Sequence, residues 1–191
     1  MTAGTLVKGT RVEEEAGLVE AFVRRDPAAF DRVVAAYQPR VARLAQRLLG
    51  WKSDDVDDVV QEVFVSAWKA LPQFRGDSSI STWLFRLTLN ECRRQRRRWI
   101  MRLGFLKRFA THRPQVQESD PLDQDERLAI VRQAIARLPL KYRQIIVLRY
   151  LEELDVPEMM RVLNLSRSAI DVRLHRAREM LAHSLGKLVE P

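Results

Sequence analysis

Residues 154–181 read LDVPEMMRVLNLSRSAIDVRLHRAREML and carry the start and stop signals of two helices joined by a short turn. Asp155 and Glu158 have the spacing of a capping box, with a proline in the first turn of the helix that this box opens. A turn follows at Asn164, and Ser166 is placed to cap a second, longer helix. A short helix, a tight turn and a longer helix are the spacing of a helix-turn-helix.

The second of these helices is amphipathic. At 100° per residue, its apolar side chains Ile170, Leu174, Ala177 and Leu181 fall in one sector. In a DNA-binding helix-turn-helix the second helix enters the major groove, so the side chains that point away from the core are candidate base readers. These are Ser168, Asp171, Val172, His175 and Arg176. The spacing alone also fits an ordinary antiparallel helix pair in a bundle.

Upstream, residues 81–98 read STWLFRLTLNECRRQRRR, an apolar run that passes into arginines without a glycine or proline. Residues 91–113 hold nine Lys or Arg against one acid, Glu91, so this segment carries a net charge of +8, equal to that of the whole chain. A charge excess this localised indicates a polyanionic partner. The alternative is a solvated basic helix end.

Candidate DNA-binding side chains occur along the same run. Phosphate binding needs several cations on one element, and base capture needs aromatic or amide side chains nearby. Trp83, Asn90, Arg93 and the arginines beyond it meet that description. For Trp83 burial in the core is the stronger interpretation, and for Asn90 a structural hydrogen bond is the alternative.

The remainder of the chain predicts an all-α fold. Apolar positions recur at intervals of three and four, and only seven glycines and eight prolines interrupt them. We expect helices from Pro27 to Gly50 behind an Asp26 cap, from Ser53 or Asp54 to Leu71, and after the loop FRGDSS with Asp77 or a following serine as cap. In the second half we expect a helix marked by Leu128, Val131, Ile135 and Leu138, and another after Pro139.

Residues 101–121 interrupt this pattern. They are basic, then rich in polar residues and proline, without apolar periodicity, which is typical of a flexible linker. The sequence therefore predicts two small helical domains, at residues 1–100 and 122–191, joined by the linker.

Several function classes are disfavoured by composition. Cys92 is the only cysteine and the three histidines are dispersed, so we expect no metal and no cofactor. No stretch approaches the roughly 20 apolar residues of a membrane span, and we expect a cytoplasmic protein without membrane insertion. Paired carboxylates, a nucleophile with its base and a phosphate loop are all missing from the sequence pattern, which disfavours an enzyme.

Two longer stretches carry a resemblance to a known family. DVDDVVQEVFVSAWKALPQFRGDSSISTWLFRLTLN, residues 55–90, resembles region two of bacterial RNA polymerase sigma factors of the extracytoplasmic-function (ECF) group. LPLKYRQIIVLRYLEELDVPEMMRVLNLSRSAIDVRLHRAREML, residues 138–181, resembles their region four. The resemblance covers nearly the whole chain, with the two regions in the family's order.

The resemblance implies a subunit that binds core RNA polymerase, recognises promoter DNA at the minus-35 and minus-ten elements and promotes strand opening, with an anti-sigma factor as its regulator. It implies polymerase docking by Asp55, Asp58, Gln61 and Glu62, for which a solvated acidic face is the alternative. It implies minus-ten recognition by the FRGDSSIST loop and the helix behind it, through Ser79, Ile80, Trp83, Asn90, Arg93, Arg94 and Arg97. The helix 167–181 side chains named above would read the minus-35 element.

Two departures from the family pattern keep other functions open. Ile80 stands where many relatives carry an aromatic residue, and Asp171 stands where they carry a basic one. The alternatives are a sigma mimic, which binds an anti-sigma factor without reading DNA, and a stand-alone helix-turn-helix regulator.

Overall fold

The computed structural model describes residues 21, 24, 26–50, 55–74, 76, 78–106 and 126–189. Within these residues every regular element is helical and none is a strand, which confirms the predicted all-α class. The helices form two groups, one before and one after the segment 107–125. This segment, which includes residues 107–121 of the predicted linker, lies outside the described residues.

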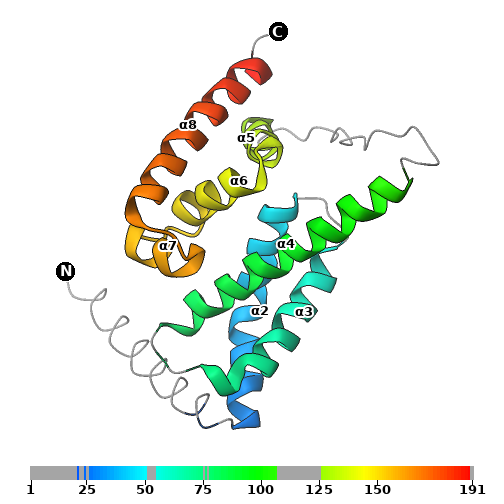
Figure 1. Cartoon of the computed structure of the whole chain (residues 1–191), viewed down its shortest axis with the longest axis vertical. Coiled ribbons are helices and arrows are strands. Elements are labelled where there is room, and N and C mark those ends of the chain that lie inside the picture. The colour runs from blue at the N-terminus through cyan, green and yellow to red at the C-terminus, as the bar shows by residue number, and fades with distance from the viewer. Residues whose placement is uncertain are drawn as a thin grey trace.

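The first group is a three-helix bundle of α2 (Pro27–Leu49), α3 (Val56–Ala70) and α4 (Ile80–Leu106), with a short 3-10 turn, η1 (Leu71–Gln73), after α3 (Figure 1). Asp26 caps α2 as predicted, because its Oδ1 accepts from the Ala28 N–H at 2.9 Å. The helix ends at Gly50, whose φ of +114° favours glycine.

The start of α3 differs in detail from the expectation, whereas the start of α4 agrees with it. The residue before α3 is Asp55, which makes no side-chain capping hydrogen bond. Ser79 precedes α4 and caps it, since its hydroxyl accepts from the Thr82 N–H at 3.2 Å. The other expected caps, Ser53, Asp54 and Asp77, lie outside the described residues.

The second group contains α5 (Glu126–Arg137), α6 (Leu140–Ile146), a π-helical turn η2 (Val147–Leu151), α7 (Val156–Leu163) and α8 (Arg167–Val189). The capping box is present in both directions: the Glu158 N–H donates to Asp155 Oδ1 at 2.7 Å, and the Asp155 N–H donates to Glu158 Oε2 at 2.9 Å. Asn164 ends α7 in the left-handed conformation, with φ 53°. The turn between α7 and α8 is therefore the predicted one.

Two features of this group were not predicted. The expected apolar stripe of α5 is only half buried, because Leu128 and Val131 are 52% and 38% exposed while Ile135 and Leu138 are packed inside. The helix after Pro139 changes to π geometry at Val147.

In the first group α4 runs to Leu106, so the first residues of the expected linker are helical. The exact domain boundaries stay a prediction.

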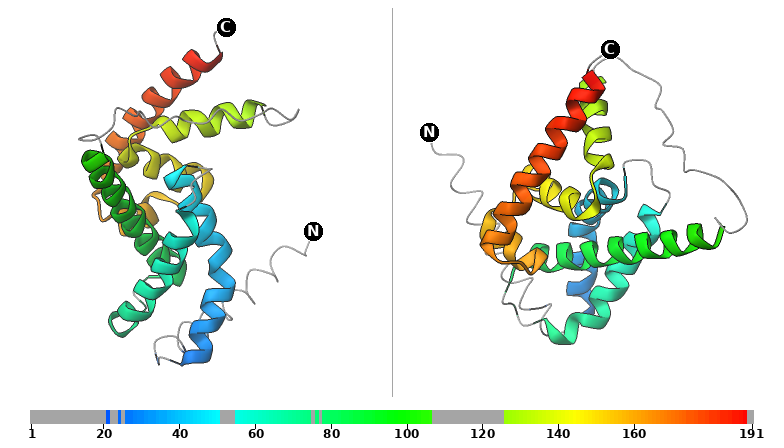
Figure 2. Two further views of the ribbon diagram at one scale, coloured as in Figure 1. Left: turned by 90° about the vertical axis from the view of Figure 1, so that its right-hand side faces the viewer. Right: turned by 45° about the horizontal axis from the view of Figure 1, so that its top comes forward.

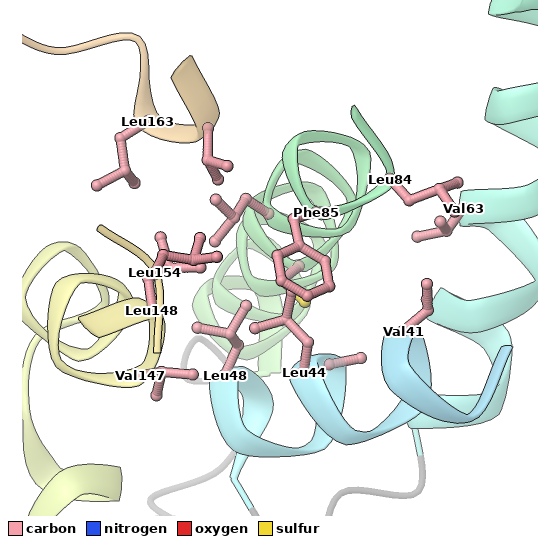
Figure 3. Packing of buried hydrophobic residues seen from close by; sticks show 14 of the residues in the cluster. Val41, Leu44, Leu48, Val63, Leu84, Phe85, Val147, Leu148, Leu154 and Leu163 are labelled. Atoms are coloured by element: carbon pink, nitrogen blue, oxygen red, sulfur yellow. The ribbon is translucent and has the colours of Figure 1, made fainter. Parts of the chain in front are cut away.

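The hydrophobic core continues from the first group of helices into the second (Figure 3). Phe85 of α4 lies beside Leu44 and Leu48 of α2, while Leu148 of η2 and Leu163 of α7 approach from the other group. The two groups are therefore packed against each other, with α7 in contact with α4, and Figure 2 shows this arrangement from two further sides.

Candidate DNA and polymerase interfaces

The outer face of α8 gathers the side chains predicted to read DNA bases. Ser168, Asp171, Val172, His175 and Arg176 are all exposed, and Val172 leaves half of its surface in solvent. The opposite face of the helix is packed inside through Ile170, Leu174 and Ala177. The predicted division of α8 into a core face and an outer face is confirmed.

Neighbouring groups orient two of these α8 side chains. A hydrogen bond from Arg176 lowers the pKa of the Tyr142 phenol on α6, so the guanidinium is held beside the ring. His175 Nε2 lies 3.4 Å from Glu179 Oε1, and both side chains are exposed. Tyr142 was not predicted as part of this face, because it is distant in the sequence and only the packing of α6 on α8 brings it there.

The middle of α4 brings Asn90 and Arg93 together. Both are partly buried, and Arg93 Nη1 lies 3.5 Å from Asn90 Oδ1. Burial lowers the pKa of Arg93, and the nearby cations Arg173 of α8 and Arg97 lower it further. This point of α4 therefore has a strongly positive potential, which favours phosphate.

Arg94 and Arg97 lie about one helical turn from each other on α4, and both are exposed. Arg94 Nη1 donates to Glu91 Oε1 at 2.9 Å, and the Ser66 hydroxyl donates to the same oxygen at 2.9 Å. Glu91 is 4% exposed, and its carboxylate links Ser66 of α3 to the guanidinium group of Arg94 on α4.

The start of α4 holds the remaining candidates for minus-ten recognition. Ile80 is fully buried in the core, and its side chain therefore contributes to packing in this conformation. Trp83 is partly buried beside Phe74, with ring centroids 4.9 Å apart. Ser79 is exposed, but its hydroxyl also donates to Thr82 Oγ1 at 2.9 Å. Burial of Ile80 corrects its placement among the DNA-contacting residues.

The four residues expected to dock on polymerase lie along one polar cleft between α3 and α4. Asp55, Asp58, Gln61 and Glu62 form one wall, and Glu91, Gln95, Arg98 and Arg102 are also part of the lining. From the sequence we expect the arginines from Arg93 onward to bind DNA. Because α4 crosses α3 here, Arg98 and Arg102 instead line the cleft that holds the carboxylates. We call this the acidic cleft.

An apolar groove lies on the other side of α3. Its lining includes Phe30, Phe64, Val65 and Trp68, and it shares Gln61 with the acidic cleft. Trp68 is 49% exposed and meets the Phe30 ring edge to face, with centroids 4.9 Å apart. A half-exposed tryptophan beside a charged cleft is typical of a protein interface.

Among the described residues no three His, Cys, Asp or Glu side chains are grouped to hold a metal ion. Nor does the described part of the chain contain a helix with the length and apolar character to cross a bilayer.

A helix-turn-helix whose second helix has an exposed polar face, together with a preceding helix that carries a run of arginines at residues 93–98, is typical of a DNA-binding protein. Comparison with protein families gives the class: residues 33–99 match the model of sigma-70 region 2, and residues 128–181 match that of sigma-70 region 4. The chain belongs to the ECF group of bacterial RNA polymerase sigma factors.

Individual relatives support this membership. The chain is 34% identical to the ECF RNA polymerase sigma-E factor of Escherichia coli K12, over 90% of this chain and 94% of the relative. It is 30% identical to the ECF sigma factor SigM of Mycobacterium tuberculosis, over 94% and 89% of the two chains. The sigma factor RpoE from Bartonella quintana, solved with the anti-sigma factor NepR, shares the fold at a TM-score of 0.66 and 22% identity, over 84% of this chain and 98% of that one.

Proposed function

We propose that this sigma factor binds core RNA polymerase in the cytoplasm, directs it to promoters through their minus-35 and minus-ten elements, and promotes strand opening, with no catalytic group of its own. The observation that supports the proposal is the presence on one chain of two surfaces with candidate DNA-binding side chains, on α8 and α4, and of a separate acidic cleft beside them. We also propose an anti-sigma factor as a partner; the sigma factor from Bartonella quintana was solved in complex with one.

For polymerase docking we propose the α3 wall of the acidic cleft. Asp58, Gln61 and Glu62 are exposed, and Gln61 adjoins the apolar groove that holds Trp68. A partner that covers both would gain charged contacts at the rim and apolar contacts in the groove, which is the usual composition of a protein interface.

For the minus-ten element we propose the exposed side of α4. Asn90 pairs with a base edge after strand opening, while Arg93, Arg94 and Arg97 bind the backbone, with Ser79 and Trp83 at the entrance of the helix. Ile80 is omitted because it is buried.

Replacing Arg93, Arg94 and Arg97 together by alanine should weaken binding to all promoters by a similar factor. Each lost phosphate contact means that fewer counterions are released from the DNA on binding. The slope of log affinity against log salt should therefore flatten by about 0.7 to 0.9 per contact. Filter binding of the polymerase complex over a salt series measures this. The matched control is Arg32→Ala with Arg132→Ala and Arg161→Ala, three exposed arginines on other helices. An unchanged slope in the α4 variant would leave its cluster as a solvated helix end.

For the minus-35 element we propose the outer face of α8, with Ser168, Asp171, Val172, His175 and Arg176 as readers. A carboxylate repels phosphate but can accept from the N4 amino group of cytosine, and Val172 can contact a thymine methyl group. Asp171 therefore changes which sequence is preferred.

Replacing Asp171 by alanine should relax discrimination at one base pair, by roughly 1 to 3 kcal/mol, because a single base contact is lost. Selection from randomised promoters with the parent and the variant measures this preference. If the variant binds every sequence more tightly with the same preferred bases, Asp171 reads no base. Glu179→Ala, which removes an exposed acid one turn further along α8, is the control.

The proposed function is tested by run-off transcription with core polymerase and a library of genomic fragments. Initiation at a defined set of promoters is expected, and failure to bind core polymerase would overturn the proposal. The exposed carboxylate of Asp171 on the reading face favours one second candidate, a sigma mimic. Binding of an anti-sigma factor combined with a lack of any upstream sequence preference would establish that candidate.

A further inference from the structure

The two helical groups are joined by a partly buried ion pair. Glu152, which follows η2, has a side chain only 5% exposed. Its Oε1 accepts from Arg47 Nη1 of α2 at 2.6 Å, and its Oε2 lies 3.6 Å from Arg40 Nε on the same helix. Arg47 also donates to the Leu151 carbonyl at 2.9 Å. One carboxylate of the second group is thus held by two guanidinium groups of the first.

A second cation spans the same junction. Arg143 of α6 is buried and its Nη1 donates to the Leu48 carbonyl, near the end of α2, at 2.7 Å. Its Nη2 donates to the carbonyls of Ala136 and Leu138 within its own group. The orphan carbonyls at the C-terminus of a helix need such donors, so the end of α2 is completed by the other group. We call Arg40, Arg47, Arg143 and Glu152 the interdomain clasp.

The third contact involves the proposed DNA-binding helix directly. Arg93 Nη2 of α4 donates to Gln144 Oε1 of α6 at 3.0 Å. In the same position Arg93 is close enough to Arg173 of α8 for their repulsion to lower its pKa. A phosphate at Arg93 would compete with Gln144 and would neutralise this repulsion.

The junction therefore combines paired charges with buried polar groups that lack a hydrogen-bond partner in the described part of the chain. Arg143 Nε and Gln144 Nε2 are buried without a hydrogen-bond partner among the described residues, and such groups cost free energy. Together with the repulsion between Arg93 and Arg173, these groups make the closed form less stable relative to the open form. A closed form of this kind can be opened by a partner that binds the open form better.

Promoter geometry requires opening. Elements at minus-35 and minus-ten lie about 25 base pairs apart, or roughly 85 Å at 3.4 Å per base pair. The whole of α8, with 23 residues, is only about 35 Å long at 1.5 Å per residue. Helix groups packed together, with Arg93 and Arg173 close to each other, cannot reach both elements.

We infer that the interdomain clasp holds the free chain in a closed, autoinhibited form, and that Glu152 must separate from Arg40 and Arg47 before both DNA-facing surfaces can be used. This inference rests on the proposed function for its inhibitory role. The closed form itself is a property of the free chain and is measured separately.

Energy transfer between two dyes measures closure. Arg86→Cys on α4 and Arg161→Cys on α7 place one label on each group, on two helices that contact each other, and both positions are exposed. Burial raises the pKa of the Cys92 thiol to about 12, so the native cysteine reacts little under the labelling conditions. The labelled parent chain should show high transfer in the absence of polymerase and DNA.

Glu152→Gln should lower the transfer, because it removes the charge and nearly keeps the shape. Glu153→Gln is the matched control, since it makes the same change at the exposed neighbouring residue, and its transfer should equal that of the parent. Arg47→Glu should also lower the transfer, and adding Glu152→Arg to it should restore part of the loss. Low transfer in the parent, or equal transfer in Glu152→Gln and Glu153→Gln, would overturn the closed form.

The inhibitory role has its own measurement. Unlabelled Glu152→Gln should bind core polymerase about tenfold more tightly than the parent, while Glu153→Gln should not change the affinity. Opening without any gain in affinity would overturn autoinhibition and leave the closed form standing. If no variant binds polymerase at all, the proposed function fails, whereas the transfer measurements still decide the clasp.

Discussion

Replacing Asp58 and Gln61 together by alanine should weaken association with core RNA polymerase by about 100-fold, the effect expected when one or two central contacts of an interface are removed. Both side chains are exposed on α3 and both line the acidic cleft, so their loss leaves no cavity in the core. Because Gln61 also borders the apolar groove, the double variant alters the point where the two parts of the proposed docking surface meet.

The control for this variant is Asp31→Ala with Gln73→Ala, an exposed acid and an exposed glutamine that are not part of the acidic cleft. Its affinity for polymerase should equal that of the parent in a titration with labelled core enzyme. Circular dichroism should show the same helix content for all three proteins. Unchanged affinity in Asp58→Ala/Gln61→Ala would place the docking surface elsewhere.

Replacing Phe85 by alanine should lower the free energy of unfolding by about 3 to 5 kcal/mol, the usual cost of removing a buried phenyl ring. Phe85 is 1% exposed and lies where the core of the first helix group meets that of the second (Figure 3). The Arg40 guanidinium also lies over its ring, 4.7 Å from the centroid, so the substitution removes a cation–π contact beside the clasp.

Urea denaturation followed by circular dichroism measures this loss. Phe85→Leu is the control, because a substitution that nearly conserves volume in a core costs less than about 1.5 kcal/mol. If both variants lose less than about 1.5 kcal/mol of unfolding free energy, the core at this junction collapses around the cavity. The ring would then matter little to the packing of the two groups.

Local signals in the sequence predicted local structure well. The capping box at Asp155, the Asp26 cap and the apolar stripe of α8 depend only on residues within a few positions of one another, so spacing was sufficient to find them. The candidate readers on α8 follow from the same periodicity. For this reason the class of fold and the outer face of the recognition helix could be predicted.

Long-range partners could not be predicted in the same way. Arg93 and Arg98 belong to one arginine run, yet the first contacts Gln144 while the second lines the acidic cleft. Which partner each side chain meets depends on how α4 crosses α3 and α6. The burial of Ile80 and the pairing of Arg47 with Glu152, 105 positions later in the chain, depend on tertiary packing for the same reason.

The π-helical turn η2 has a consequence for insertions and deletions. In it the Glu152 N–H bonds to the Val147 carbonyl, five residues back instead of four, so the turn accommodates one residue more than an α-helical turn would. Deleting one residue from η2 would allow a regular helix and would rotate every following side chain by about 100° about the axis. Glu152 would then turn away from Arg40 and Arg47. A single-codon deletion at this turn would thus change how the two halves of the chain are joined without altering any residue of the α8 and α4 surfaces proposed to bind DNA.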